Sequence, residues 1–80
     1  MLSIDNIIPK NKNHIYSIEF QDKDIQSSKS SIYSFSKLFN FRIINRTTIQ
    51  CQFKGGLIVL MYQLQKLSFN HPSINIIVKA

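Results

Sequence analysis

Acidic residues, cysteine, glycine, proline and tryptophan are all scarce in this chain of 80 residues. The single cysteine excludes an internal disulfide framework, so a small secreted protein held together by disulfides is not expected. Four acidic residues stand against ten Lys and Arg, which gives a formal net charge of +6. Such an excess favours polyanionic partners, meaning RNA, DNA or an anionic membrane face. A chain this short forms one small domain with a thin core and often depends on a partner.

Long hydrophobic runs are missing as well. The longest uninterrupted apolar run extends from Leu57 to Tyr62, too short to span a bilayer, so no transmembrane segment is expected. Asp5 lies within the first residues, and no basic region is followed there by an apolar one. We therefore expect neither a secretory signal nor an Arg-rich presequence.

The residue types that carry catalysis, redox chemistry or metal binding are few and scattered. Cys51 has no second thiol with which to exchange, which predicts a buried structural thiol. His14 and His71 have no acidic or thiol partner at ligand spacing, so no metal site is expected. Paired carboxylates on one rigid element and a nucleophile next to a base are also missing. These observations predict a protein that is not an enzyme and needs no cofactor.

The clearest pattern lies in the last 34 residues. Alternation of apolar and polar residues predicts a strand over residues 47–53. Gly55 and Gly56 then allow a sharp turn where a side chain would clash. Helical spacing of apolar residues follows and predicts a helix over 56–69, ended by Pro72. A β-branched run predicts a strand over 73–79, which gives a β-α-β unit with neighbouring parallel strands.

Two groups of apolar residues occur along the predicted helix. The first falls on one stripe: Leu57, Leu60, Met61, Leu64 and Leu67. Ile58, Tyr62 and Phe69 flank that stripe. We therefore expect the helix to be covered on more than one side.

The first part of the chain is less regular. Residues 1–13 form an apolar and then basic lead, expected to be a tail ordered on contact or a basic arm lying along RNA. Alternation predicts a strand over 14–20, and the polar residues 21–31 indicate a loop. A short helix is predicted over 31–39 with Ser30 or Ser31 as its cap, followed by an extended segment over 41–44. Phe39, Phe41 and Ile43 favour a strand instead. Residues 14–80 are thus predicted to form a single α/β domain.

A family resemblance rests on the order strand, glycine turn, helix and strand, and on Leu64-Gln65-Lys66-Leu67-Ser68-Phe69-Asn70-His71-Pro72. This segment resembles the thioredoxin-like domain of certain mitochondrial ribosomal proteins, which a small accessory subunit of respiratory complex I shares. The resemblance implies a structural component of a mitochondrial ribosome, in the matrix, with rRNA and ribosomal proteins as partners. The family domain continues past the second strand, so the resemblance also implies that residues 1–46 or another chain complete the sheet.

Side chains that neutralise RNA phosphates are predicted from the basic residues. The expected RNA-facing residues are Arg42, Arg46, Lys54, Lys66, Lys10 and Lys12. Gly55 and Gly56 present backbone amides at a helix start, where they could meet a phosphate or a neighbouring protein. Ile74 and Ile76 belong to a strand that is either the centre of the sheet or an edge completed by a partner, and we expect them to contact that partner. The aromatic residues near the cations, Tyr33, Phe35 and Phe41, are either core residues or platforms for unpaired bases.

Three alternatives stay open. The first is the accessory subunit of complex I, in which the same fold acts as a protein-protein wedge. The second is a small basic linker of a phycobilisome, because Tyr33-Ser34-Phe35-Ser36-Lys37-Leu38 ahead of Gly55-Gly56-Leu57-Ile58-Val59 resembles that linker domain. In that family the residues after the glycines form a strand, so the conformation of 57–69 separates the two resemblances. The third is a free-standing phage or plasmid protein that binds nucleic acid.

Overall fold

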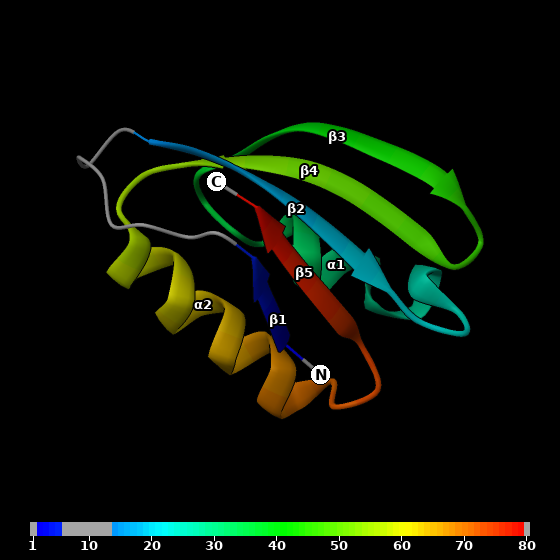
Figure 1. Ribbon diagram of the computed structural model, residues 1–80. Coiled ribbons are helices and arrows are strands. Elements are labelled where there is room, and N and C mark those ends of the chain that lie inside the picture. The colour runs from blue at the N-terminus through cyan, green and yellow to red at the C-terminus, as the bar shows by residue number, and fades with distance from the viewer. Residues whose placement is uncertain (1, 6–13, 80) are drawn as a thin grey trace.

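A five-stranded sheet organises the chain in the computed structural model, which describes residues 2–5 and 14–79 (Figure 1). Its strands are β1 (Leu2–Asp5), β2 (Ile15–Gln21), β3 (Leu38–Asn45), β4 (Thr48–Lys54) and β5 (Asn75–Lys79). The helical segments are the 3₁₀ helix η1 (Ile25–Ser28), the short helix α1 (Lys29–Tyr33) and the long helix α2 (Leu57–Asn70). The α/β class predicted from the sequence is confirmed.

The strands lie in the order β1-β5-β2-β4-β3. Strand β2 is antiparallel to both β4 and β5, β3 is antiparallel to β4, and β1 is parallel to β5. Because β4 and β5 both oppose β2, they run in the same direction, with α2 as their connection. The expectation that they are neighbours was wrong, since β2 lies between them. Strands β2 and β3 are likewise connected through α1 and separated by β4. The two units β2-α1-β3 and β4-α2-β5 therefore interleave, which is the split βαβ, or ferredoxin-like, arrangement.

Strand β2 occupies the centre because it has apolar partners on both sides. Tyr16, Ile18 and Phe20 all point to one face of the sheet, and each is at most 2 % exposed. Their partners across β4 are Phe53, Cys51 and Ile49, and Ile18 and Phe20 also pair with Val78 and Ile76 of β5. A sheet in which β4 and β5 paired directly would leave β2 at an edge, with apolar neighbours on one side only. Residues 1–46 therefore supply three of the five strands, β1, β2 and β3.

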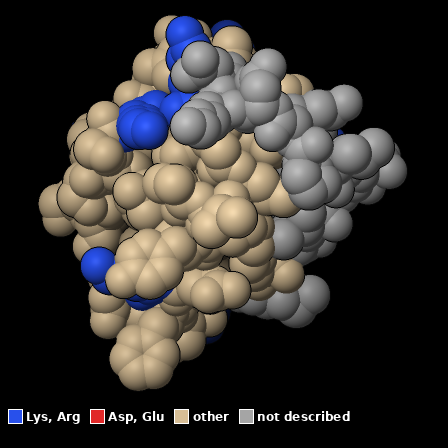
Figure 2. Space-filling model, turned by 90° about the vertical axis from the view of Figure 1, so that its left-hand side faces the viewer, with Lys and Arg blue, Asp and Glu red and all other residues tan. Residues whose placement is uncertain are grey.

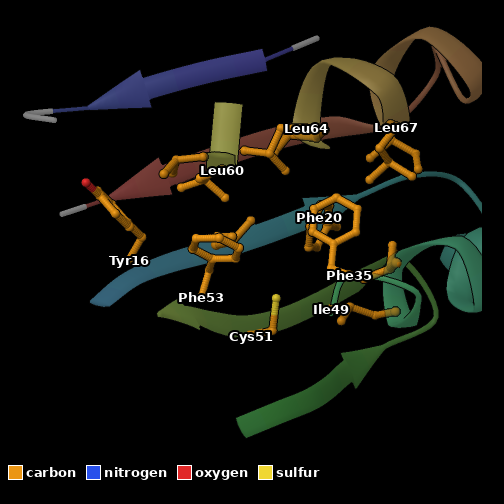
Figure 3. Close-up of a cluster of buried hydrophobic side chains, with 14 of the residues drawn as sticks. Tyr16, Phe20, Phe35, Ile49, Cys51, Phe53, Leu60, Leu64 and Leu67 are labelled. Carbon is orange, nitrogen blue, oxygen red and sulfur yellow. The ribbon is translucent and has the colours of Figure 1, made fainter. Parts of the chain in front are cut away.

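Helix α2 covers this apolar face. Leu60, Leu64 and Leu67 lie at helical spacing and point at the sheet, as Figure 3 shows. Full burial of each such side chain is worth about 1.5–3 kcal/mol. The same core takes in Ile25, Ile32 and Phe35 from the segment between β2 and β3, so both helical connections lie on one side of the sheet.

The elements predicted over 47–53, 56–69 and 73–79 are confirmed to within two residues at each boundary. The short helix predicted over 31–39 was misplaced, because α1 begins at Lys29, directly after η1, and ends at Tyr33. Neither Ser30 nor Ser31 caps it; Ser28 occupies the N-cap position. The segment from Leu38 is a strand instead, since pairing with β4 satisfies its backbone groups along the open edge of that strand.

The lead predicted over 1–13 is not simply a tail. Residues 2–5 form β1, which pairs in parallel with β5 from Leu2 opposite Ile76 to Asp5 opposite Lys79. Lys10 and Lys12, expected to face RNA, lie outside the described residues.

Candidate nucleic-acid interface

The face of the sheet away from the helices is polar and is not covered by any described helix. Cross-strand pairing aligns its side chains in rows. One row is Arg42-Gln50-Glu19-Ile77 and the next is Phe39-Gln52-Ser17-Lys79, with Lys54 beyond them opposite Ile15. We call this set of residues the open sheet face. The twist of the sheet hollows it into a shallow depression of about 660 Å³, whose lining includes Arg42, Lys79 and both glutamines of β4.

Amide side chains tie neighbouring strands together across the open sheet face. Gln50 Nε2 donates to Glu19 Oε1 at 2.9 Å, and Gln21 Nε2 donates to the other carboxylate oxygen of Glu19. Asn40 Nδ2 donates to Gln52 Oε1 at 2.8 Å. The acid at the centre of this face is therefore bonded to two amides. The surface that results combines fixed hydrogen-bonding groups with cations at its sides.

Three exposed cations belong to the open sheet face: Arg42 on β3, Lys54 on β4 and Lys79 on β5. Strands β3 and β5 are three strand spacings apart, which separates Arg42 and Lys79 by about 14 Å or more. This exceeds the screening length of about 8 Å at physiological salt. Cations so far apart act on separate charges, so the face suits an extended polyanion better than one small anion.

A β-bulge places Arg42 on this face. Between Phe39 and Arg42, β3 has one residue more than β4 has between their partners Gln52 and Gln50. Within the bulge, Asn40 adopts a left-handed conformation with φ of 56°, which asparagine tolerates better than most residues. Regular alternation would turn Arg42 and Phe39 to opposite faces. The strand that Phe39, Phe41 and Ile43 favoured in the sequence is confirmed as part of β3. The bulge places Ile43 opposite buried Ile49, on the other face of the sheet from Phe39.

The predicted RNA-facing residues divide between different surfaces. Arg42 and Lys54 share the open sheet face. Arg46 lies in the β3–β4 turn, at the opposite end of β4 from Lys54, and its carbonyl accepts a hydrogen bond from the Ile25 amide at 3.1 Å. Lys66 lies on α2, in the helical layer, with its ammonium 5.6 Å from the ring centre of Tyr62. The four described residues therefore do not form one site.

The predicted partner-contact residues need correction. Ile74 and Ile76 are fully buried, and β5 lies inside the sheet between β1 and β2, so a partner cannot reach them. Gly55 is buried as well: a Cβ there would lie 2.8 Å from Cε1 of Phe53. Gly56 is half-buried with open space beside it, and it is the N-cap of α2. Of the four, only Gly56 is accessible to another molecule.

Lys79, Glu19, Gln50 and Gln52 are the members of this face that sequence reasoning did not single out. Each is the polar member of an alternating strand pattern, which shows that the residue faces away from the core. The pattern does not show which strands are neighbours. Only the strand order brings Lys79 and Arg42 to the same face.

The central strands β2 and β4 carry no aromatic platform for bases on this face, and the aromatic residue in its rows is Phe39 of the edge strand β3. Phe35 is 8 % exposed and meets Phe20 edge to face, with ring centres 6.3 Å apart, which confirms the core alternative. Phe41 packs against the core and against Tyr33, with ring centres 4.2 Å apart. On the open sheet face, the central strands β2 and β4 present serine, glutamate, glutamine and lysine.

Cys51 lies in the core at 3 % exposure, and burial raises the pKa of its thiol to about 12. Among the described residues, no three His, Cys, Asp or Glu side chains are grouped so as to hold a metal ion. No helix in the described part of the chain has the length and apolar character needed to cross a membrane.

No family model, curated protein or solved structure matches this chain.

Proposed function

We propose that this protein is a non-catalytic, RNA-binding structural component of a ribonucleoprotein assembly, with its open sheet face against the RNA. The observation that carries this proposal is a polar sheet face, covered by no described helix, with Arg42, Lys54 and Lys79 on a chain of net charge +6. Glu19, an acid on the central strand of this face, is hydrogen-bonded to glutamine amides. The family resemblance makes the mitochondrial ribosome, in the matrix, the specific assembly that we propose.

The proposed contact is with the RNA backbone and not with its bases. RNA-binding sheets that read sequence stack bases on aromatic residues of their central strands. On β2 and β4 the corresponding positions are Ser17, Glu19, Gln50 and Gln52, none of which can stack. The serine and glutamine side chains can donate to phosphate oxygens, and the Glu19 carboxylate can only accept from a ribose hydroxyl. Binding is then expected to depend on salt and to be nearly independent of sequence.

A second candidate is the complex I accessory subunit. Exposed apolar residues on α2, described below, favour a role in protein-protein contact. Co-sedimentation with ribosomes that is abolished by ribonuclease would exclude this candidate, whereas sedimentation with inner-membrane complexes would favour it. We do not propose the phycobilisome linker, because residues 57–70 are helical where that domain requires a strand.

The decisive experiment compares two triple variants that remove the same charge. The first, Arg42→Gln/Lys54→Gln/Lys79→Gln, alters the open sheet face. The second, Lys23→Gln/Arg46→Gln/Lys66→Gln, removes three exposed cations elsewhere. Affinities for a structured rRNA fragment and for single-stranded homopolymers are measured by fluorescence anisotropy over a range of salt concentrations.

Loss of three phosphate contacts makes the negative slope of log K against log salt less steep by about 2 for single-stranded RNA. We expect this change in the first variant only, with similar affinities of the wild-type protein for different homopolymers. Equal effects of the two variants would show that the charge acts without a defined face. A wild-type protein that ignores RNA at low salt would refute the proposal.

A further inference from the structure

A second surface lies on α2, on the side away from the sheet. Ile58 and Phe69 are each 86 % exposed, Tyr62 is 64 % exposed and Val59 is 43 % exposed. We call these four residues the outer α2 stripe. The sequence led us to expect that Ile58, Tyr62 and Phe69 would be covered, and the structure leaves them exposed.

The outer α2 stripe is continuous along the helix. Ile58, Tyr62 and Phe69 are separated by four and seven residues, which returns each to the same side of a helix with 3.6 residues per turn. The core residues Leu60, Leu64 and Leu67 lie on the opposite side. Because a helix rises 1.5 Å per residue, the stripe from Ile58 to Phe69 extends along roughly 17 Å, long enough for another helix to lie against it.

Its size is that of a functional patch. An aromatic side chain buries about 150–250 Å² when it is covered, so Tyr62 and Phe69 alone leave roughly 300 Å² exposed. Together with Ile58 and Val59, the patch is comparable to the largest apolar patches of ordinary monomers, which are often interaction sites. A standard interface covers about 800 Å² per partner. The stripe is large enough to form the apolar centre of such an interface, and polar residues around it would have to supply the rest of the area.

The charges beside the stripe indicate what that rim must contain. Lys66 is the only charged residue in α2, and its ammonium lies 5.6 Å from the ring centre of Tyr62. Figure 2 looks at the side of the molecule where α2 begins, and its described surface shows Lys and Arg but no Asp or Glu. A complementary surface is therefore apolar along its centre and acidic at its margin.

We propose that the outer α2 stripe binds an acidic amphipathic helix of a partner protein. A second copy of this chain is a poorer occupant, because two copies would bring a net charge of +6 against another +6 with no acid on α2 to pair with Lys66. A membrane surface is poorer too, since helices that lie in an interface carry many cations on a polar face, and the opposite face of α2 is buried in the core. The stripe lies in the helical layer and the open sheet face on the other side of the sheet, so the two proposals can fail separately.

The test uses synthetic peptides of about 14–18 residues, held helical by lactam bridges, long enough to run along α2. One has leucine along its apolar side and glutamate beside it, and the other has lysine in place of every glutamate outside the bridges. Binding to the full chain is measured by fluorescence anisotropy. The test variant is Ile58→Gln/Phe69→Gln, and the matched control is Ile15→Gln/Ile44→Gln, which alters two exposed apolar residues outside α2. Circular dichroism confirms that each variant is folded.

We expect saturable binding of the acidic peptide, at least about tenfold tighter than that of the basic peptide and at least about tenfold weaker in the test variant. The control and the open-face triple variant should bind the acidic peptide as the wild type does. Equal affinity for the two peptides, or no loss in the test variant, overturns the proposal. It is also overturned if the wild-type chain forms a dimer, or binds anionic phosphatidylglycerol vesicles, in a way that the test variant abolishes.

Discussion

Substitution of Gly55 by alanine tests the packing at the turn between β4 and α2. The new Cβ would lie 2.8 Å from Cε1 and 3.1 Å from Cζ of Phe53, a ring that is fully buried. The backbone cannot easily move away, because the Gly55 amide donates to the His14 carbonyl at 2.9 Å. Neither glycine has a positive φ, so the close approach, and not the backbone conformation, requires glycine at position 55.

The expected cost follows from two opposing terms. Overpacking of this kind costs about 1–3 kcal/mol, while the lower entropy of the unfolded chain returns about 0.4–1 kcal/mol. We expect Gly55→Ala to lower the free energy of unfolding by about 1–2 kcal/mol, and the melting temperature by roughly 5–15 °C in a domain of this size. Urea denaturation and thermal melting followed by circular dichroism measure both.

Gly56→Ala is the matched control. Nothing lies within 4 Å of a Cβ at Gly56, and its φ of −80° and ψ of 151° suit alanine. The entropic gain is offset by the poorer N-cap preference of alanine, so the net change should stay within about 0.5 kcal/mol. If Gly55→Ala were as stable as Gly56→Ala, the tight contact with Phe53 would be refuted. A smaller side chain at position 53, in Phe53→Leu, should remove most of the cost of Gly55→Ala in a double-mutant cycle.

Two further predictions concern Cys51 and Asn40. Since burial raises the pKa of Cys51 from 9.0 to about 12, the folded protein keeps this proton above pH 9 while the unfolded chain loses it. The stability contributed by the neutral thiol is complete below pH 9 and falls by up to about 1.4 kcal/mol per pH unit above it. The free energy of unfolding of Cys51→Ala, measured by urea denaturation, should therefore decline less steeply above pH 9 than that of the wild type. Parallel declines would contradict the burial of the thiol. At Asn40, whose φ is 56°, valine should cost about 1–2 kcal/mol more than glycine, because a β-branched residue does not tolerate the left-handed conformation. Equal stabilities of Asn40→Val and Asn40→Gly in urea would show that the bulge is absent.

Patterns that depend on neighbouring residues were interpreted correctly from the sequence. Alternation in β2 and β4 and helical spacing in α2 each specify one buried face, and each local period is strong enough to decide the element. Where two periods competed, between residues 31 and 45, the prediction was less accurate. Residues 38–45 form a strand there because β4 offered an open edge for pairing. That edge is distant in the chain from residues 31–39, so their helix-like spacing could not reveal it.

The candidate site was only partly predictable for the same reason. Arg42 and Lys54 could be named from charge, yet their grouping with Lys79 required the strand order, and the orientation of Arg42 required the bulge at Asn40. Arg46 and Lys66 are similar to them in the sequence but lie on other surfaces. Ile58, Tyr62 and Phe69 were recognised as apolar, but whether they were covered could be judged only once the single covered face of α2 was known.

The sequence by itself determined the α/β class, the net charge of +6 and most of the buried residues, because composition and short periods act within a few residues of the chain. The tertiary structure decided that β2 lies between β4 and β5, that one face of the sheet stays open and that α2 exposes a second apolar stripe. These features depend on contacts between segments far apart in the chain, which are set by the burial of several apolar faces at once.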